Sequence, residues 1–495
     1  MANIEQFIDY QFNLGLNTDL AKIQVSDKEL VEAKNVDIMP RGGISKRFGV
    51  VPVNESSYED KVHQIIEFPR DNGNVELLAL IGGELCSLAP DGTPSVIQAV
   101  NADYIPYFYL QDKFYFIDPG EEYYVYDGAL CEPVTPHEDE LNDLEPIKNC
   151  KYAHYHSESN RIFFAGDHEN VSALYFSEFN DPTFVKGTNV VHPTRAEGRI
   201  LGISVLMDAI IVGYTRGFYI WRGIDPIQDA IWEKLPTSKG IANNKSFALT
   251  TSSLSFVNKD GIYSVTPNIM GIAMENEAEE GYMNDITKDR VSKLLKECTD
   301  YNNINSVFYN RENKLLVAYS DLESGQNNKI IVTDFTNKSF SLYEGLEVND
   351  FCEMSNGDLY LAMDNYITKL TDHSSSDFTP GGVETVINFK MKTPKYGLGN
   401  PFLRKKVHKV FVIYKNFGEV SELVLSLYID NEKKQEWTLT GEDNNAEIIT
   451  KRLKTLYSGN NFQLEIENTQ YSEVEIYGIG FYYSYADTGG SKMHG

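Results

Sequence analysis

The chain has 495 residues, of which 42% are hydrophobic, so it is long enough for two or more domains with sizeable cores. Its 44 Lys and Arg against 72 Asp and Glu give a formal net charge of −28, which argues against a protein that grips nucleic acid by its phosphates. The 31 Tyr and 26 Phe favour strands, and the 36 Gly and 18 Pro are scattered as turn residues. The composition therefore predicts an all-β fold.

The cysteines and the N-terminus bear on the place of synthesis. Five cysteines, an odd number without a CxxC pair, predict neither disulfides nor a zinc site and fit a reducing compartment. The opening MANIEQFIDYQF has neither the basic nor the apolar region of a signal peptide. No apolar run approaches the ~18 residues of a membrane span. We therefore expect synthesis in the cytoplasm and no membrane span.

Residues 1–54 are predicted to form an N-terminal arm and the first strands. Residues 27–34 have the composition of one or two helical turns, and Ser26 is a suitable N-cap. Glu29 follows Ser26 by three residues, which completes a capping-box pattern. We therefore expect a short helix over 27–34.

The segment Asn35–Gly49 reads NVDIMPRGGISKRFG. Pro40 fixes φ, and the following Gly42 and Gly43 permit a tight reversal. Apolar Ile38 and Ile44 flank this reversal, so the segment predicts a hairpin tip with basic flanks at Lys46 and Arg47. On turn chemistry alone, an ordinary Pro-Gly turn is the preferred interpretation of this segment.

Residues 55–371 repeat a pattern of paired short strands separated by polar turns. Units begin near residues 61, 104, 150, 199, 241, 303 and 348. A period of ~40–50 residues with four short strands is typical of a β-propeller. We expect six to eight blades, one of them closed by an N-terminal strand near residues 44–53, because closure protects the ring from an open edge.

One interval is longer than the others and contains NDITKDRVSKLLKEC at residues 284–298. Ile286, Val291, Leu294 and Leu295 fall near helical spacing, which predicts one inserted amphipathic helix. Packing on a blade edge is the plain interpretation of this helix, and a moving gate is the alternative.

Residues 372–382, DHSSSDFTPGG, are predicted to form a linker. The period ends there, and residues 383–495 show longer alternating strands of the size and pattern of a β-sandwich. The basic run Arg404–Lys406 is interpreted as a solvated guard of an edge strand, and phosphate or partner contact is the alternative.

No catalytic constellation stands out in the sequence. His154 and His156 alternate along a probable strand and could share a face, but no third metal ligand is indicated, so ordinary strand histidines are the preferred interpretation. There is no G-x-S-x-G elbow, Walker A loop or H-E-x-x-H motif. We expect no catalytic residue, no cofactor and no metal, although blade-turn carboxylates leave glycoside hydrolysis open.

The segment Asn35–Gly49 resembles the opening motif of bacteriophage tail proteins of the tail-nozzle (tail tubular protein B) and tail-hub type. The segments ALYFSEFNDPTF at 173–184 and GRILGISVLMDAIIVGYTRGFYIWRG at 198–223 resemble later parts of the same proteins. This chain departs from them in its low Trp content and its separate C-terminal sandwich. The residues that carry the motif are Asn35, Pro40, Gly42, Gly43, Lys46, Arg47 and Gly49.

The resemblance implies a structural virion protein, made in the host cytoplasm, that is not an enzyme. It implies a ring of identical copies, commonly a hexamer, that extends the DNA ejection channel. The implied partners are portal-adaptor or other tail proteins, and tail fibres or spikes. In such a ring, the acidic residues would line a channel wall along which phage DNA slides without specific binding. A solvated protein surface is the alternative explanation of the acidic composition. The alternative is a tail-borne propeller that binds or hydrolyses host-surface glycan.

Overall fold

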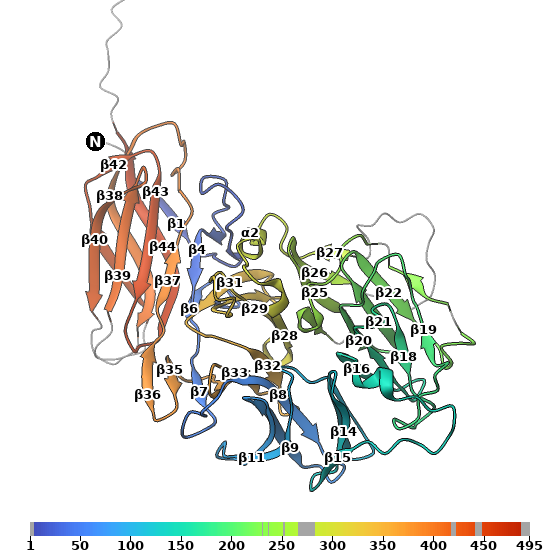
Figure 1. The fold of residues 1–495 in the computed structure, drawn as a ribbon. Coiled ribbons are helices and arrows are strands. Elements are labelled where there is room, and N and C mark those ends of the chain that lie inside the picture. The colour runs from blue at the N-terminus through green and yellow to red at the C-terminus, as the bar shows by residue number, and fades with distance from the viewer. Residues whose placement is uncertain are drawn as a thin grey trace, which may run out of the picture.

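The computed structural model describes residues 4–229, 231–235, 237–250, 253–265, 283–416, 422–440 and 448–486. The described chain is almost entirely β-structure, arranged as a propeller with a β-sandwich beside it (Figure 1). The predicted all-β propeller followed by a sandwich is therefore confirmed.

Seven four-stranded antiparallel units form the propeller, and each begins close to a predicted unit start. Six are separate sheets, and the remaining one, blade 6, belongs to a larger sheet. The first four blades contain β8 (Val62–Pro69), β9 (Val75–Ile81), β10 (Glu84–Leu88) and β11 (Pro94–Ala99); β12 (Tyr107–Leu110), β13 (Lys113–Asp118), β14 (Glu122–Tyr126) and β15 (Cys131–Pro133); β16 (Tyr152–His156), β17 (Arg161–Ala165), β18 (Leu174–Phe176) and β19 (Val190–Val191); and β20 (Gly202–Leu206), β21 (Ala209–Tyr214), β22 (Gly217–Trp221) and β23 (Glu233–Lys234).

The ring is closed by a strand from the N-terminal arm. Strand β7 (Val50–Pro52) pairs with β34 as the outermost strand of blade 7, as the sequence predicts. This closure ties residues that are more than 300 positions apart in the chain. The last three blades contain β24 (Phe247–Leu249), β25 (Leu254–Asn258), β26 (Gly261–Val265) and β27 (Met283–Asp285); β28 (Asn305–Tyr309), β29 (Lys314–Tyr319), β30 (Lys329–Asp334) and β31 (Ser339–Glu344); and β32 (Asp350–Glu353), β33 (Leu359–Ala362) and β34 (Ile367–Leu370) with β7.

Apolar side chains between neighbouring blades hold the ring together. One buried cluster joins blades 1 and 2 through Phe68, Phe114 and Phe116, and another joins blades 3 and 4 around Phe163 and Trp221. Similar clusters lie between most other neighbouring blades. Burial of these aromatic faces removes apolar area from water, which is the main favourable term in folding.

Two sheets form the sandwich, and both contain strands from the N-terminal arm. The first has β1 (Glu5–Asp9), β5 (Val36–Ile38), β6 (Ile44–Lys46), β38 (Lys405–Asn416), β41 (Ile449–Lys454), β42 (Ser458–Gly459) and β44 (Val474–Tyr485). The second has β4 (Glu32–Lys34), β37 (Phe389–Lys392), β39 (Glu422–Ile429), β40 (Glu432–Thr440) and β43 (Phe462–Asn468). Their facing side chains form one large core.

Strand β4 makes the sandwich continuous with the propeller. It pairs in parallel with β31 of blade 6 and antiparallel with β37, so blade 6 and the second sandwich sheet share one 11-stranded sheet. The arm also contributes β2 (Gly15–Leu16), which lies between β3 (Glu29–Leu30) and β31. The division of the chain at residues 54, 371 and 382 stays a prediction. Residues 372–382 themselves include β35 (Ser376–Thr379), which pairs with β36 (Val383–Val386).

The helix predicted over residues 27–34 is wrong. Ser26 and Glu29 do interact locally, since the Ser26 N–H donates to the Glu29 carboxylate at 3.0 Å, but the chain continues as β3 and β4. The Glu29 carboxylate also accepts from Asn17 at 3.0 Å and pairs with Arg290 at 2.9 Å. These tertiary contacts and burial of Leu30 outweigh the local helix propensity.

The second predicted helix is present but much shorter than residues 284–298. Asn284 belongs to β27, and only Ser292–Lys296 (α2) is helical. The apolar residues Val291, Leu294 and Leu295 are buried, so the amphipathic interpretation is correct for this part. One further α-helix in the described chain, α1 (Glu145–Lys148), was not expected from the sequence.

The basic run at Arg404–Lys406 is only partly a solvated edge guard. Lys405 has no exposed surface, and its Nζ donates to the carbonyl oxygens of Gly397 and Asn400. Arg404 is exposed as expected. The alternation of residue types therefore predicted this strand correctly. It could not show that Lys405 is buried and bonded to the preceding loop at Gly397 and Asn400.

Candidate functional site

The segment of residues 35–49 lies where the arm, the propeller and the sandwich meet, and we call it the junction motif. Its hairpin is formed as predicted, with β5 paired to β6 and Ile38 opposite Ile44. The tip is a tight turn in which the Met39 N–H donates to Gly43 O at 2.8 Å and the Gly42 N–H to Met39 O at 2.9 Å. Pro40 stands within this turn.

The two tip glycines are required by close backbone approach. Gly42 has φ +86°, a left-handed conformation that favours glycine, and its carbonyl accepts from the Phe12 N–H at 2.9 Å. A Cβ on Gly43 would lie 3.1 Å from Ile476 O of β44. The tip is therefore pressed against the arm on one side and the sandwich on the other.

Asn35 connects three parts of the chain through one side chain. It has φ +53°, which asparagine tolerates better than most residues. Its Oδ1 accepts from the Arg47 Nε at 3.0 Å and from the Glu344 N–H of blade 6 at 2.9 Å. Its Nδ2 donates to Asn388 O at 3.0 Å, at the start of the sandwich. The oxygen and the nitrogen of this buried amide are thereby both hydrogen-bonded.

Arg47 forms a buried, two-pronged ion pair with Asp377. Nη1 lies 2.9 Å from Oδ1 and Nη2 lies 2.7 Å from Oδ2, and the Arg47 side chain is only 1% exposed. Nη1 also donates to Phe48 O at 2.9 Å, and Asp377 Oδ1 accepts from the Val50 N–H at 3.2 Å. The pair therefore locks β7, the closing strand of the ring, to β35.

Lys46 ties the junction motif to the loop before β44. Its Nζ donates to Asn468 Oδ1 at 3.2 Å, to Gln470 O at 2.7 Å and to Ser472 O at 3.2 Å. Burial, and then the positive charge of Arg47, lowers the pKa of Lys46 to about 8. The basic flanks of the hairpin are thus interior ties and are not exposed to a nucleic-acid phosphate.

The lowered pKa of Lys46 predicts an unusual pH dependence of stability. Because a lysine in the unfolded chain has a pKa near 10.5, the unfolded state binds more protons than the folded state between about pH 8 and that value. The contribution of Lys46 to the free energy of unfolding therefore rises with pH in this window. We expect the free energy of unfolding of the wild type minus that of Lys46→Met, both measured in urea, to increase from pH 8 to pH 10. A difference that stays constant or shrinks would contradict this.

Gly49 completes the motif at the point of closest approach. Its N–H donates to Ser374 O at 2.9 Å, and its carbonyl accepts from the Thr371 N–H at 3.0 Å. A Cβ on this residue would lie 1.7 Å from Ser376 O. All seven motif residues are thus brought together at one joint. Sequence reasoning missed Asp377 and Asn468, the partners of Arg47 and Lys46, because nothing in the local pattern marks them.

The two histidines singled out from the sequence have different surroundings. His156 is buried between blades 3 and 4, with Nδ1 2.8 Å from Ser159 Oγ and Nε2 3.0 Å from Asp208 O. His154 borders a cavity of about 350 Å³ on the propeller axis, and burial lowers its pKa to about 4. Among the described residues, no group of three or more His, Cys, Asp and Glu is placed to hold a metal ion.

Aromatic side chains line this axial cavity. They come from the innermost strands β12 and β16 and the residues just before them, namely Tyr104, Tyr107, Phe108, Tyr109, Tyr152 and Tyr155. Lys245 lies over the Tyr104 ring at 4.8 Å and 3.9 Å from the carboxylate of Asp350. Burial raises the pKa of Asp350, whose carboxylate also accepts from the Ile65 N–H and Asn305. This polar cluster joins blades 1, 5, 6 and 7 at their inner ends.

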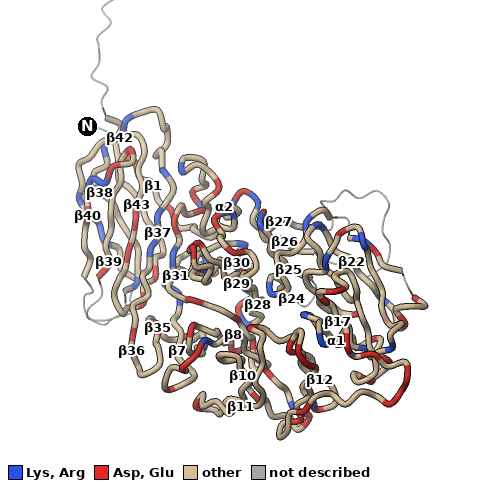
Figure 2. The backbone as a smooth tube through the Cα atoms, in the orientation of Figure 1, with Lys and Arg blue, Asp and Glu red and all other residues tan. Residues whose placement is uncertain are grey.

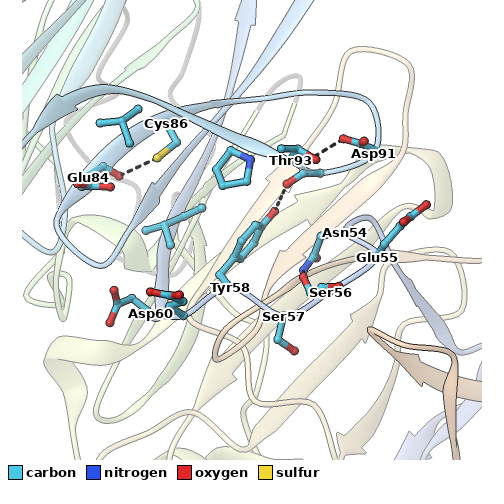
Figure 3. A pocket seen from close by; sticks show the side chains of 15 residues that line it. Asn54, Glu55, Ser56, Ser57, Tyr58, Asp60, Glu84, Cys86, Asp91 and Thr93 are labelled. Carbon is cyan, nitrogen blue, oxygen red and sulfur yellow. Dashed lines mark hydrogen bonds between the residues drawn. The ribbon is translucent and has the colours of Figure 1, made fainter.

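A second cavity, of about 460 Å³, lies between residues 54–60 and blade 1 (Figure 3). Tyr58 points across it and donates to Gly92 O at 2.9 Å, and several carboxylates surround it. Burial raises the pKa of Tyr58 to about 12 and that of Cys86 to about 11. Neither group is therefore an activated nucleophile at neutral pH.

The fold and its joint define a β-propeller protein with an attached β-sandwich. The sequence matches no protein-family model, and it matches no curated protein. In the described chain no helix has the length and apolar character needed to cross a membrane.

Comparison with solved structures finds other propellers at low similarity. The extracellular domain of the one-component system protein BT4673 from B. thetaiotaomicron is 11% identical over 67% of this chain and 40% of its own, with a TM-score of 0.42. The Pan2 WD40 domain of Neurospora crassa is 12% identical over 66% of this chain and 96% of its own, also at 0.42. An exo-β-1,3-galactanase from Phanerochaete chrysosporium is 9% identical over 86% of this chain and all of its own, at 0.31. The match thus spans well under half of the BT4673 domain.

Proposed function

We propose that the protein is a structural component of a bacteriophage tail, a nozzle or hub ring that extends the DNA ejection channel. The observation that carries this proposal is the junction motif, whose residues resemble the opening motif of such tail proteins. Apart from Pro40, which is exposed in the turn, each motif residue contacts another part of the chain and helps to join arm, propeller and sandwich into one body. That role suits a part that must stay rigid in an assembly, and it requires no catalytic group.

The charge of the chain supports the same role. Lys46 and Arg47, the basic residues of the motif, are interior, so they add no phosphate-binding surface. A wall with few free cations would let DNA pass without the counterion release that accompanies phosphate binding. Duplex DNA should therefore not be retained by the protein at low salt.

The proposal is tested on purified virions of the phage whose genome encodes the chain. Mass spectrometry should find the protein in the particle, and antibodies raised against it should label the tail. Its absence from virions would refute the proposal. Tight, salt-sensitive retention of duplex DNA by the isolated protein would refute the sliding wall, but it would leave tail membership standing.

The axial cavity favours glycan binding as the second candidate function. Tyr104, Tyr107, Tyr109 and Tyr152 offer aromatic faces, and Asn244 and His154 offer polar atoms beside them. This mixture is typical of a small-molecule site. None of the described lining residues is an Asp or Glu, so the cavity does not supply the carboxylate pair of a glycosidase. Binding to host-surface glycans that is lost in Tyr107→Ala would favour this candidate.

A further inference from the structure

The net charge is concentrated in one part of the molecule. Residues 55–371, which hold the blades, contain 24 Lys and Arg against 49 Asp and Glu. Residues 383–495 contain 14 of each. Nearly the whole charge of −28 therefore belongs to the propeller, while the sandwich is neutral and mixes blue and red segments in Figure 2.

The outer face of the first sandwich sheet carries exposed charges around a covered aromatic ring, since Phe411 is only 4% exposed and Tyr482 is half-buried. On β38 and β44, Val410, Val412 and Phe481 point into the core. The intervening residues form the outer face, where the Phe411 ring lies over Gly480 and contacts Tyr482 at 5.5 Å between ring centroids.

Three cations stand on this face without an ion-pair partner among the described residues. Lys409 of β38 lies directly opposite Lys454 of β41, and Arg452 lies opposite Phe411. All three cations are exposed, and within the described ranges no carboxylate lies within 4 Å of them. Like charges directly opposite each other destabilise a strand pair, so this arrangement has a cost in the isolated chain. We call these three residues and the half-buried Tyr482 ring, which lies opposite Lys409 on β44, the basic face.

An acidic loop lies across the ring from the sandwich. Residues 134–144 connect blades 2 and 3, which are opposite blade 6 in the order of the ring. Glu138, Asp139 and Glu140 are exposed, and the neighbouring Leu141 is 62% exposed. We call residues 138–141 the acidic loop.

The acidic loop is held in a fixed shape. Asn142 Nδ2 donates to His137 O at 3.0 Å and to Thr183 O at 2.9 Å, and the Asp143 N–H donates to Val185 O at 2.8 Å. The exposed carboxylates and Leu141 are thus presented on an ordered support, so little conformational entropy would be lost when a partner binds them.

We propose that the basic face of one copy docks on the acidic loop of the next copy. The two surfaces are complementary in charge, and the half-buried Tyr482 ring on one and the exposed Leu141 on the other lie beside those charges. They are different surfaces on opposite sides of one chain, so the contact is head-to-tail, which closes into a ring when the rotation per copy allows it. This inference rests on the proposed tail function and names the surfaces that build its ring.

Nucleic acid is the less favoured occupant of the basic face. Only three cations on this face could bind phosphates. The propeller of the same chain carries an excess of 25 carboxylates, which repel the phosphates of a nucleic acid. A second copy instead brings those carboxylates to the cations. We therefore assign the face to the acidic loop of a neighbour, and a DNA-binding face would be visible as one outcome of the test.

The test uses two variants of the full chain and their mixture. The face variant carries Lys409→Ser, Arg452→Ser and Lys454→Ser, and the loop variant carries Glu138→Ser, Glu140→Ser and Leu141→Ser. Analytical ultracentrifugation over a concentration series should show wild-type oligomers and association about tenfold or more weaker in each variant. A 1:1 mixture should form a heterodimer that grows no further, because only one intact contact is left.

The controls remove charges of the same sign at other places on the surface. Lys433→Ser with Lys434→Ser on the other sheet, and Glu158→Ser with Glu323→Ser on other blade loops, should associate like the wild type. Unchanged association of the face or loop variant, or a mixture without heterodimer, would overturn the inference, as would DNA retention that depends on the basic face. If the wild type is monomeric at all concentrations, the inference fails, while detection of the protein in virions still decides the tail function separately.

Discussion

Replacing Arg47 by Met is expected to lower the free energy of unfolding by about 3–5 kcal/mol. The Asp377 carboxylate would lose both guanidinium hydrogen bonds in a site where water has little access. Phe48 O and Asn35 Oδ1 would each lose a donor as well. Because the Asp377 carboxylate is buried, water cannot replace the hydrogen bonds that it loses. Urea unfolding followed by circular dichroism measures the loss.

The partner substitutions separate the ion pair from general packing damage. Asp377→Ala should cost a similar amount, because it leaves the guanidinium unpaired. The double variant Arg47→Met with Asp377→Leu should be more stable than either single variant, since replacing a whole buried pair by apolar groups avoids the uncompensated charge. Arg47→Lys should be destabilised too, because an ammonium cannot make the two-pronged contact. Additive losses in the double variant would mean that the pair itself contributes nothing.

The blades were predictable because their signal is local. Each blade is a meander of short strands joined by tight turns, so its strands and turns follow one another in the sequence. The predicted unit starts near 61, 104 and 150 lie within three residues of the first strands of blades 1, 2 and 3. The hairpin of the junction motif was predictable for the same reason, since Ile38 and Ile44 pair across a turn that Pro40 and two glycines mark.

The joint was not predictable because its partners are distant. Arg47 and Asp377 are 330 residues apart, and Lys46 and Asn468 are 422 apart. Asp377 stands in a Ser-, Gly- and Pro-rich stretch that has the composition of a linker, although it forms half of a buried ion pair. Glu29 similarly matches a helix cap but is used in a tertiary contact with Arg290. Local propensity cannot show that a polar side chain will be buried by elements far away in the chain.

The position of the motif also explains why its sequence is so particular. An ordinary turn tolerates many residues on either side of its tip, whereas here the flanking Asn35, Lys46 and Arg47 each form hydrogen bonds to distant parts of the chain. The motif therefore specifies the angle between propeller and sandwich. In the ring that we propose, a change in that angle would displace the basic face relative to the acidic loop and prevent closure.

Gly49→Ala is expected to be among the most damaging single-methyl changes at the described glycines, with a loss of about 3 kcal/mol or more. The added Cβ would lie 1.7 Å from Ser376 O, which is a backbone atom and cannot rotate away. Gly49 cannot move either, because its N–H and carbonyl are bonded to Ser374 and Thr371. Gly187→Ala is the matched control, since its Cβ would meet nothing closer than 3.9 Å and its stability should stay within about 0.5 kcal/mol of wild type. Equal thermal and urea stability of the two variants would show that β7 and β35 are not locked together as described.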